Sequence, residues 1–241
     1  MIIVDFNQTL ISNLMANINS NPNEDINEDL IRHMVLSSIL YYKRKFGAEF
    51  GDLVFAADDK NYWRRDIFPY YKAGRKKARE ASKFDWKLIF NTLNQIRDEI
   101  RETFPYTVIQ VERAEADDII ATLCKHVQPD PDFPLAPDSE PILIISGDKD
   151  FIQLQKYPNV KQYSPIQKKF IKHADPESYL KEHIIRGDSG DGVPNFLSQD
   201  DVFMVEGIRQ KPIRKTKLAE WLKKDPEEFC DDTMMRGFHR N

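Results

Sequence analysis

The chain has 241 residues, 41% of them apolar and 31% charged, with a net charge of −4. These values describe a globular protein with one sizeable core, or a core plus a small satellite domain, and they exclude a disordered chain. No apolar run approaches the ~18 residues that cross a membrane, and the first residues lack the basic start of a secretory signal. Cys124 and Cys230 are the only cysteines, too few for a disulfide framework or a zinc site, so we expect a reducing cytoplasm.

Apolar periodicity predicts strands that alternate with helices, followed by helices alone. Strands are expected at residues 2–4, 52–57, 107–111 and 142–146, with a small hairpin at 160–163 and 169–171. Helices are expected at about 27–46 and 86–100, after the acids at 112–118 up to about 127, and from 175 onward except at 187–195. Residues 128–141 hold five prolines in fourteen positions, which predicts a surface loop. This order predicts an α/β sheet followed by a small helical module, and it leaves the strand order open.

Acidic residues stand where three predicted strands end, at the start of the helix after 107–111, and in the glycine-rich loop 187–192. They are Asp5, Asp58, Glu115, Asp117, Asp148, Asp150, Asp188 and Asp191. The carboxyl ends of parallel strands share one edge of a sheet, where ligands bind, so we expect these side chains to converge. Each one taken singly also fits an ordinary turn residue or helix N-cap, and it is their coincidence that favours a site.

So many carboxylates in one pocket would repel, and several would stay protonated unless cations bound there. Oxygen ligands without histidine or cysteine select Mg²⁺ or Mn²⁺ rather than zinc. Two such ions about 3.5–4 Å apart suit phosphoester cleavage, because one lowers the pKa of the attacking water and the other neutralises the leaving oxygen. The acids therefore predict a two-metal site.

Two basic segments contrast with the acidic average. Residues 62–79 hold seven basic residues and one acid, interleaved with five aromatic rings, and residues 209–217 hold five basic residues and no acid. Cations bind phosphates and aromatic rings stack on unpaired bases, so both segments predict contacts with nucleic acid. The residues concerned are Arg64, Arg65, Tyr71, Lys72, Arg75, Lys76, Lys77, Arg79, Arg214, Lys215 and Lys217. A plain solvated surface is the alternative for each segment.

Together these motifs resemble the flap endonuclease / 5′-nuclease superfamily, most closely the T-even-phage type of ribonuclease H. In family order they read VDFNQ, the Asp58 strand end, YWRRD with YYKAGRKKARE, EADD, ISGDKDF and GDSGDGVP. EADD and SGDKDF, in this order and spacing, are the specific ones. The resemblance implies a PIN-like parallel-sheet nuclease domain at 1–180 with a helical arch at 60–82, and a helix–three-turn–helix duplex-binding module at 181–241.

The resemblance also implies an activity and its parts. The activity would be divalent-metal-dependent 5′→3′ exonuclease and flap cleavage on DNA and RNA–DNA hybrids, as in primer removal, leaving 5′-phosphate and 3′-hydroxyl ends. The eight acids would bind two Mg²⁺ or Mn²⁺ ions, and Asp118 would contact these ligands without binding an ion itself. Lys72 and Arg75 would contact the scissile phosphate. A K⁺ ion is expected in the C-terminal module, and a single-strand-binding protein and a sliding clamp are expected as partners. The protein is expected to be a monomer, not bound to a membrane, in the cytoplasm. If a phage encodes it, this is the cytoplasm of the host cell.

The chain departs from the family pattern at three points. It reads VEGIRQKPIRKTK at 205–217, where cellular members have a glycine hairpin, so the duplex contact and the potassium site stay open. Asp59 adjoins Asp58, and either could be the metal ligand. Family members also run longer, so we expect a further C-terminal segment beyond Asn241, including any clamp-binding tail.

Two other classes compete with this interpretation. VDFNQ and GDSGDG also look like the first and last motifs of haloacid-dehalogenase-type phosphatases. That class needs a second Asp two residues after Asp5, where this chain has Asn7, and it leaves EADD unexplained. A non-catalytic binder of branched DNA would keep the basic segments and make the acids incidental. Cleavage of forked DNA without turnover of a small phosphomonoester would decide against both.

Overall fold

The computed structural model describes residues 1–21, 25–128 and 140–241, and the chain divides into two compact units. Unit 1 comprises residues 1–62 and 85–174, and unit 2 comprises residues 63–84 and 175–241. Most of the predicted arch therefore groups with the C-terminal residues in a single compact unit. Nearly all of the predicted loop at 128–141 lies outside the described residues.

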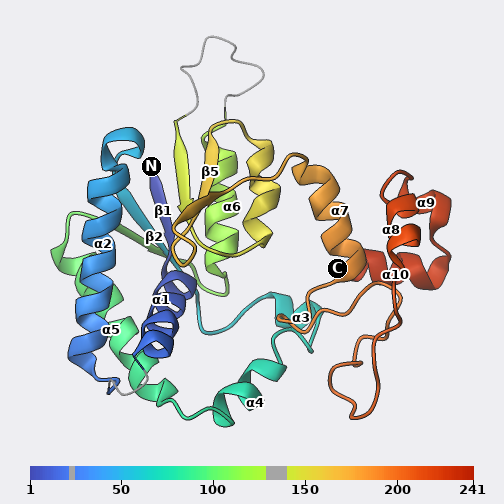
Figure 1. The fold of residues 1–241 in the computed structure, drawn as a ribbon, viewed down its shortest axis with the longest axis horizontal. Helices are drawn as coiled ribbons and strands as arrows, with labels where there is room; N and C mark the ends of the chain where they lie inside the picture. The colour runs from blue at the N-terminus through green and yellow to red at the C-terminus, as the bar shows by residue number, and fades with distance from the viewer. Residues whose placement is uncertain (22–24, 129–139) are drawn as a thin grey trace. The chain divides into compact units, whose positions relative to one another are not determined.

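A six-stranded sheet forms the centre of unit 1, in the order β3-β2-β1-β4-β5-β6 (Figure 1). The strands are β1 Ile2–Asp5, β2 Leu53–Ala57, β3 Thr107–Gln110, β4 Ile142–Ile145, β5 Val160–Ser164 and β6 Lys169–Ile171. The first five run parallel and β6 is antiparallel to β5, which confirms the predicted α/β sheet and hairpin. The chain order reverses between β1 and β4, and such a switch point is where ligands bind in open α/β sheets.

Both faces of the central strands are apolar and covered by helices. The helices of unit 1 are α1 Phe6–Ser20, α2 Glu28–Phe50, α5 Trp86–Thr103, α6 Ala116–His126 and the 3-10 helix η1 Asp150–Lys156. Ile3 and Ala56 belong to a buried cluster that includes Ile120 of α6. Phe55 points to the opposite face, where it meets Phe6 of α1 edge-on. No helix in the described ranges is long and apolar enough to cross a membrane.

Helix α1 has no counterpart among the predicted elements. Its buried apolar residues recur every four positions from Phe6 to Ile18, but polar Asn and Ser residues with weak helix propensity are frequent between them. The helix begins because the carboxylate of Asp5, at the end of β1, accepts the backbone N–H of Gln8 at 3.3 Å. Asp5 is thus held by a strand on one side and a helix on the other.

Unit 2 is helical. Its helices are α3 Arg64–Ile67, α4 Gly74–Glu80, α7 Pro176–Arg186, α8 Lys215–Trp221, α9 Pro226–Phe229 and α10 Asp232–Arg240. The core contains an aromatic cluster in which Trp221 meets Phe196 edge-on and stacks on Phe229. Arg240 of α10 donates to the Asp200 carboxylate at 2.6 Å, which ties the loop after residue 195 to the last helix.

Candidate metal centre and nucleic-acid interface

Three carboxylates converge at the carboxyl edge of the sheet in unit 1. Asp5 ends β1, Asp58 directly follows β2, and Asp148 comes three residues after β4. The three strands are adjacent and parallel, and the register pairs Asp5 with Ala56, two residues before Asp58. The structure therefore brings together acids that are more than fifty residues apart in the chain, at the edge where the sequence predicts them.

Asp5 is the most perturbed of these acids. Its side chain is 3% exposed. Burial, and then the negative charges of Asp58 and Asp148, raise its pKa from 3.8 to about 8. Hydrogen bonds from the N–H of Gln8 and from the Ser146 hydroxyl, at 3.3 and 3.1 Å, act against this rise. They do not compensate the crowded negative charge, and a bound cation would.

Asp58 connects the end of β2 to the start of α6. Its Oδ1 accepts the N–H of Ala116 at 2.8 Å, and its Oδ2 accepts the side-chain amide of Asn7 at 3.0 Å. Asp59 has a different role, because its Oδ2 accepts the N–H of Arg113 at 3.0 Å, which lowers its pKa. The geometry favours Asp58 as the candidate ligand and makes Asp59 a residue that fixes the loop before α6.

Glu115 and Asp117 lie at the N-terminus of α6. Glu115 is the N-cap, 1% exposed, and Asp118 accepts its N–H at 3.0 Å in a capping box. The alternative that an acid here caps the helix is therefore observed for Glu115, with Asp118 as its partner in the capping box. It is compatible with metal binding, because each carboxylate has two oxygens with several acceptor positions. Asp117 stands in the first turn between the two capping residues.

Ser146 links the acids of β1 and β4. Its hydroxyl donates to Asp5 at 3.1 Å and accepts the N–H of Asp148 at 3.1 Å, while Asp148 Oδ1 accepts the N–H of Asp150 at 3.0 Å. Gln162 of β5 donates to the Ser146 carbonyl oxygen at 3.2 Å. Ser146, like Asn7, is not among the predicted site residues. The signal for both was their place inside the ISGDKDF and VDFNQ motifs.

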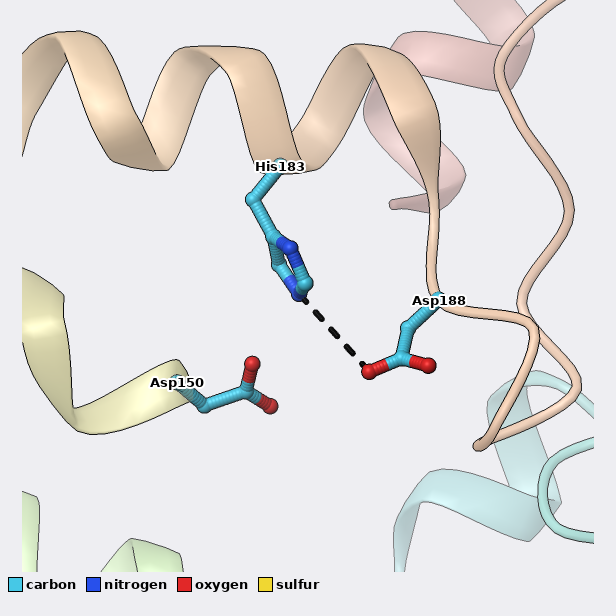
Figure 2. Close-up of side chains that lie close together, drawn as sticks. All are labelled: Asp150, His183 and Asp188. Atoms are coloured by element: carbon cyan, nitrogen blue, oxygen red, sulfur yellow. Dashed lines mark ion pairs between the residues drawn. The ribbon is translucent and has the colours of Figure 1, made fainter. Parts of the chain in front are cut away.

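The loop 187–195 of unit 2 closes on Asp188. Gly187 has a φ of 65°, and a Cβ there would lie 2.4 Å from the Pro194 carbonyl oxygen, so glycine is required. Asp188 Oδ1 accepts the N–H of Gly190 at 2.7 Å, and its other oxygen lies 4.0 Å from Nε2 of His183 in the last turn of α7 (Figure 2). No local motif in the sequence marks His183 as the neighbour of Asp188.

Asp191 is the centre of a charge cluster within unit 2. Arg75 donates to its carboxylate, Lys72 Nζ lies 3.5 Å from it, and the hydroxyl of Tyr71 donates to it at 3.1 Å. Lys72 also has a left-handed φ of 55°, and its N–H donates to the Asp191 carbonyl oxygen at 2.7 Å. Lys72 and Arg75, the two residues predicted to hold the scissile phosphate, thus lie together because both pair with the Asp191 carboxylate.

Most of the other predicted nucleic-acid residues lie at the surface of unit 2. Exposed side chains are Arg65, Lys76, Lys77, Arg214, Lys215 and Lys217, and partly exposed ones are Arg64 and Arg79. The Arg64 guanidinium lies 4.7 Å above the ring of Trp63, and Lys217 pairs with Glu220 at 2.9 Å. Tyr71 faces inward and is buried.

The sequence is similar to known exonucleases, ribonucleases and flap endonucleases. The sequence profile of the 5′–3′ exonuclease N-terminal, resolvase-like domain matches residues 4–184. Ribonuclease H of Enterobacteria phage T4 is 38% identical over 233 residues, which cover 94% of this chain and 73% of that protein. Flap endonuclease Xni of Shewanella pealeana is 32% identical over 140 residues, covering 55% of this chain and 48% of that protein.

Solved structures agree on the fold. The D15 protein of phage T5, crystallised with metal ions, matches with a TM-score of 0.62 and 16% identity, over 98% of this chain and 86% of that one. A complex of the T5 D15 flap endonuclease with DNA and metal ions matches with a TM-score of 0.61 and 18% identity, over 98% of this chain and 86% of that one.

The fold, the acidic edge and the family match define a 5′ nuclease. The chain belongs to the 5′–3′ exonuclease family, as its motifs predicted, and its function is that of a 5′–3′ exonuclease or flap nuclease related to the phage ribonuclease H. The family match decides against the phosphatase alternative.

Proposed function

We propose that this 5′ nuclease cleaves flap and forked DNA and the RNA strand of RNA–DNA hybrids, as in primer removal, with two divalent ions at the acidic edge of unit 1. The observation that carries the metal site is the convergence of Asp5, Asp58 and Asp148 at the switch point of the sheet, where burial and the neighbouring charges raise the pKa of Asp5. An edge that raises the pKa of a buried acid is suited to cations, because a cation restores the charged form.

The donor set of unit 1 fits hard ions such as Mg²⁺ or Mn²⁺. It consists of carboxylate oxygens on Asp5, Asp58, Glu115, Asp117, Asp148 and Asp150. Two bound ions of this kind would lower the pKa of the attacking water and neutralise the leaving oxygen. Asn7 and Ser146 orient the carboxylates of Asp58 and Asp5 by hydrogen bonds, which fixes the donor atoms before any ion arrives.

In unit 2, Lys72 and Arg75 are proposed to hold the scissile phosphate. Asp191 keeps both cations together, so the phosphate oxygens meet charges that are already gathered. The exposed residues Arg214, Lys215 and Lys217 are proposed to hold the duplex backbone, since cations on an exposed helix start neutralise phosphates without reading sequence. The products are a 5′-phosphate and a 3′-hydroxyl.

Further parts of the proposal concern unit 2 and the setting of the protein. Asp188 and Asp191 as metal ligands, a K⁺ ion in the C-terminal module, and partners such as a single-strand-binding protein or sliding clamp follow from the family resemblance. A monomer in the cytoplasm of a host cell is proposed on the same ground.

A labelled flap substrate tests the proposal. The chain is incubated with a 5′-labelled DNA flap, and with the same flap bearing RNA at its 5′ end, in the presence of Mg²⁺, Ca²⁺ or a chelator. We expect cleavage with Mg²⁺ only, because Ca²⁺ accepts looser coordination and positions the reacting oxygens less strictly. Cleavage that persists in excess chelator would refute the two-metal mechanism.

A further inference from the structure

Unit 2 contains a cavity of about 310 Å³ in which the proposed function gives a role to Arg75 alone. Its walls come from the arch and from the loops on either side of residue 195, and they include Tyr70, Arg75, Ala78, Gly190, Phe203 and Met204. This volume lies at the lower end of the range of small-ligand pockets, about 300–1,000 Å³. A cavity of this size suits one small group rather than a helix or a duplex.

The apolar walls of this cavity are exposed to solvent. Phe203 is 41% exposed and Met204 is 51% exposed, and Val205 and Ile208 continue the exposed apolar run. Exposed apolar residues in a contiguous patch mark a binding surface more often than an isolated one does. Tyr70 adds an aromatic ring that is also partly open to solvent.

The charges around the cavity suit a phosphate next to an apolar group. Arg75 lines it, and Lys72 shares the Asp191 carboxylate with Arg75. Asp200 also lines the cavity, but its charge is compensated by Arg240 at 2.6 Å and Arg236 at 3.7 Å, so it does not repel an anion strongly.

Glycines leave the peptide chain open at the cavity. Gly192 has a φ of 75°, and a Cβ there would lie 2.9 Å from the Tyr70 carbonyl oxygen, so no larger residue fits. A Cβ on Gly74, which also lines the cavity, would meet nothing within 4 Å, so the space beside this residue is open. Exposed aromatic rings beside a guanidinium are features that bind an unpaired nucleobase and its phosphate.

We propose that this cavity takes the base of one unpaired nucleotide of the substrate strand, against Phe203, Met204 and Tyr70, with the adjoining phosphate on Arg75. The inference rests on the proposed function for the presence of an unpaired strand. It adds a base-binding subsite in unit 2, and it gives a role to the exposed side chains of Phe203 and Met204.

Binding to single-site abasic flaps tests this subsite. A set of fluorescent DNA flaps, each with one abasic position in the single strand, is titrated with the wild-type chain in Ca²⁺ by anisotropy. One position is expected to bind about 5- to 150-fold more weakly when abasic, the range of base–aromatic stacking, and the others to bind as the intact flap does. Equal binding at all positions would overturn the proposal.

Two variants and a matched control locate the effect. Phe203→Ala is expected to weaken binding of the intact flap and to remove the difference between intact and abasic flaps at that one position. Ala78→Leu, which fills the cavity from the exposed face of α4 without deleting a side chain, is expected to do the same. Phe104→Ala, at a residue of unit 1 with a similar exposure of 39%, is expected to change nothing. An abasic effect that survives in both cavity variants would refute the subsite.

The binding assay separates this inference from the proposed function. Loss of cleavage in Mg²⁺ with an intact abasic effect in Ca²⁺ would refute the nuclease mechanism and support the subsite. Normal cleavage with no abasic effect would refute the subsite alone.

Discussion

The two units surround their key carboxylates with opposite chemistry. In unit 1, Asp5 accepts hydrogen bonds from an amide and a hydroxyl, and burial together with neighbouring acids raises its pKa to about 8. In unit 2, Asp191 is paired with Lys72 and Arg75. An aspartate therefore lies among other acids in unit 1 and is neutralised by two basic side chains in unit 2. What a carboxylate can do follows from its partners, and a motif alone does not reveal them.

The largest expected effect comes from removing a proposed metal ligand in unit 1. Asp117→Asn should keep fork binding and lower the cleavage rate by a factor on the order of 10²–10³, the loss typical for one preorganised charge-stabilising group. Single-turnover cleavage and anisotropy binding measure the two parts separately. Asp52→Asn, an exposed acid paired with Lys43, is the control and should cleave normally. Near-normal cleavage by Asp117→Asn would remove this residue from the site.

Removing a cation of the Asp191 cluster in unit 2 should have a smaller effect. Arg75→Ala should lower single-turnover cleavage by roughly 10- to 150-fold, because hydrogen bonds to charged groups contribute about 1.5–3 kcal/mol. Lys83→Ala, at an exposed cation of unit 2 outside the predicted nucleic-acid residues, is the matched control. If both variants lose activity equally, general positive charge rather than the clustered guanidinium is responsible.

The pKa of Asp5 predicts how the metal-free chain responds to pH. The folded chain holds the Asp5 proton up to about pH 8, whereas an unfolded chain loses it near 3.8. The folded state binds more protons between these values, so stability is greatest below about pH 4 for this group and falls as pH rises through about 8. Each kcal/mol lost should lower the melting temperature by about 2–4 °C.

Thermal unfolding in chelator at several pH values measures this trend. Asp5→Asn should flatten it, since the amide does not titrate, and Mg²⁺ should raise the melting temperature of the wild-type chain most at high pH. If the wild-type chain and the Asp5→Asn chain had the same pH profile of melting temperature, the pKa of Asp5 would not be raised in the folded state.

Removing the exposed lysines of α8 should have the mildest effect. Replacing Lys215 and Lys217 by Ala should weaken duplex binding for all sequences and flatten the salt dependence by about one per lost phosphate contact. The Lys217 contribution is expected to be the lesser one, because this side chain already pairs with Glu220. A titration of binding against salt concentration checks both single variants, and an unchanged slope would make this helix ordinary surface.

The sequence by itself determined the strands, most helices of unit 1 and the acids that follow the strands. Apolar periodicity is a local signal, and the parallel arrangement of β1, β2 and β4 then requires Asp5, Asp58 and Asp148 to share one edge. Helix α1 escaped prediction because its apolar residues are spaced four apart among polar residues of weak helix propensity, and burial against β2 outweighs that propensity.

Only the tertiary structure decided which neighbour each acid has. The choice of Asp58 over Asp59 depends on hydrogen bonds to Asn7 and to the start of α6, more than fifty residues away in each direction. The pairing of Asp191 with Arg75 spans 116 residues. Contacts of this range leave no trace in local spacing, because they depend on how whole elements pack rather than on the residues between them.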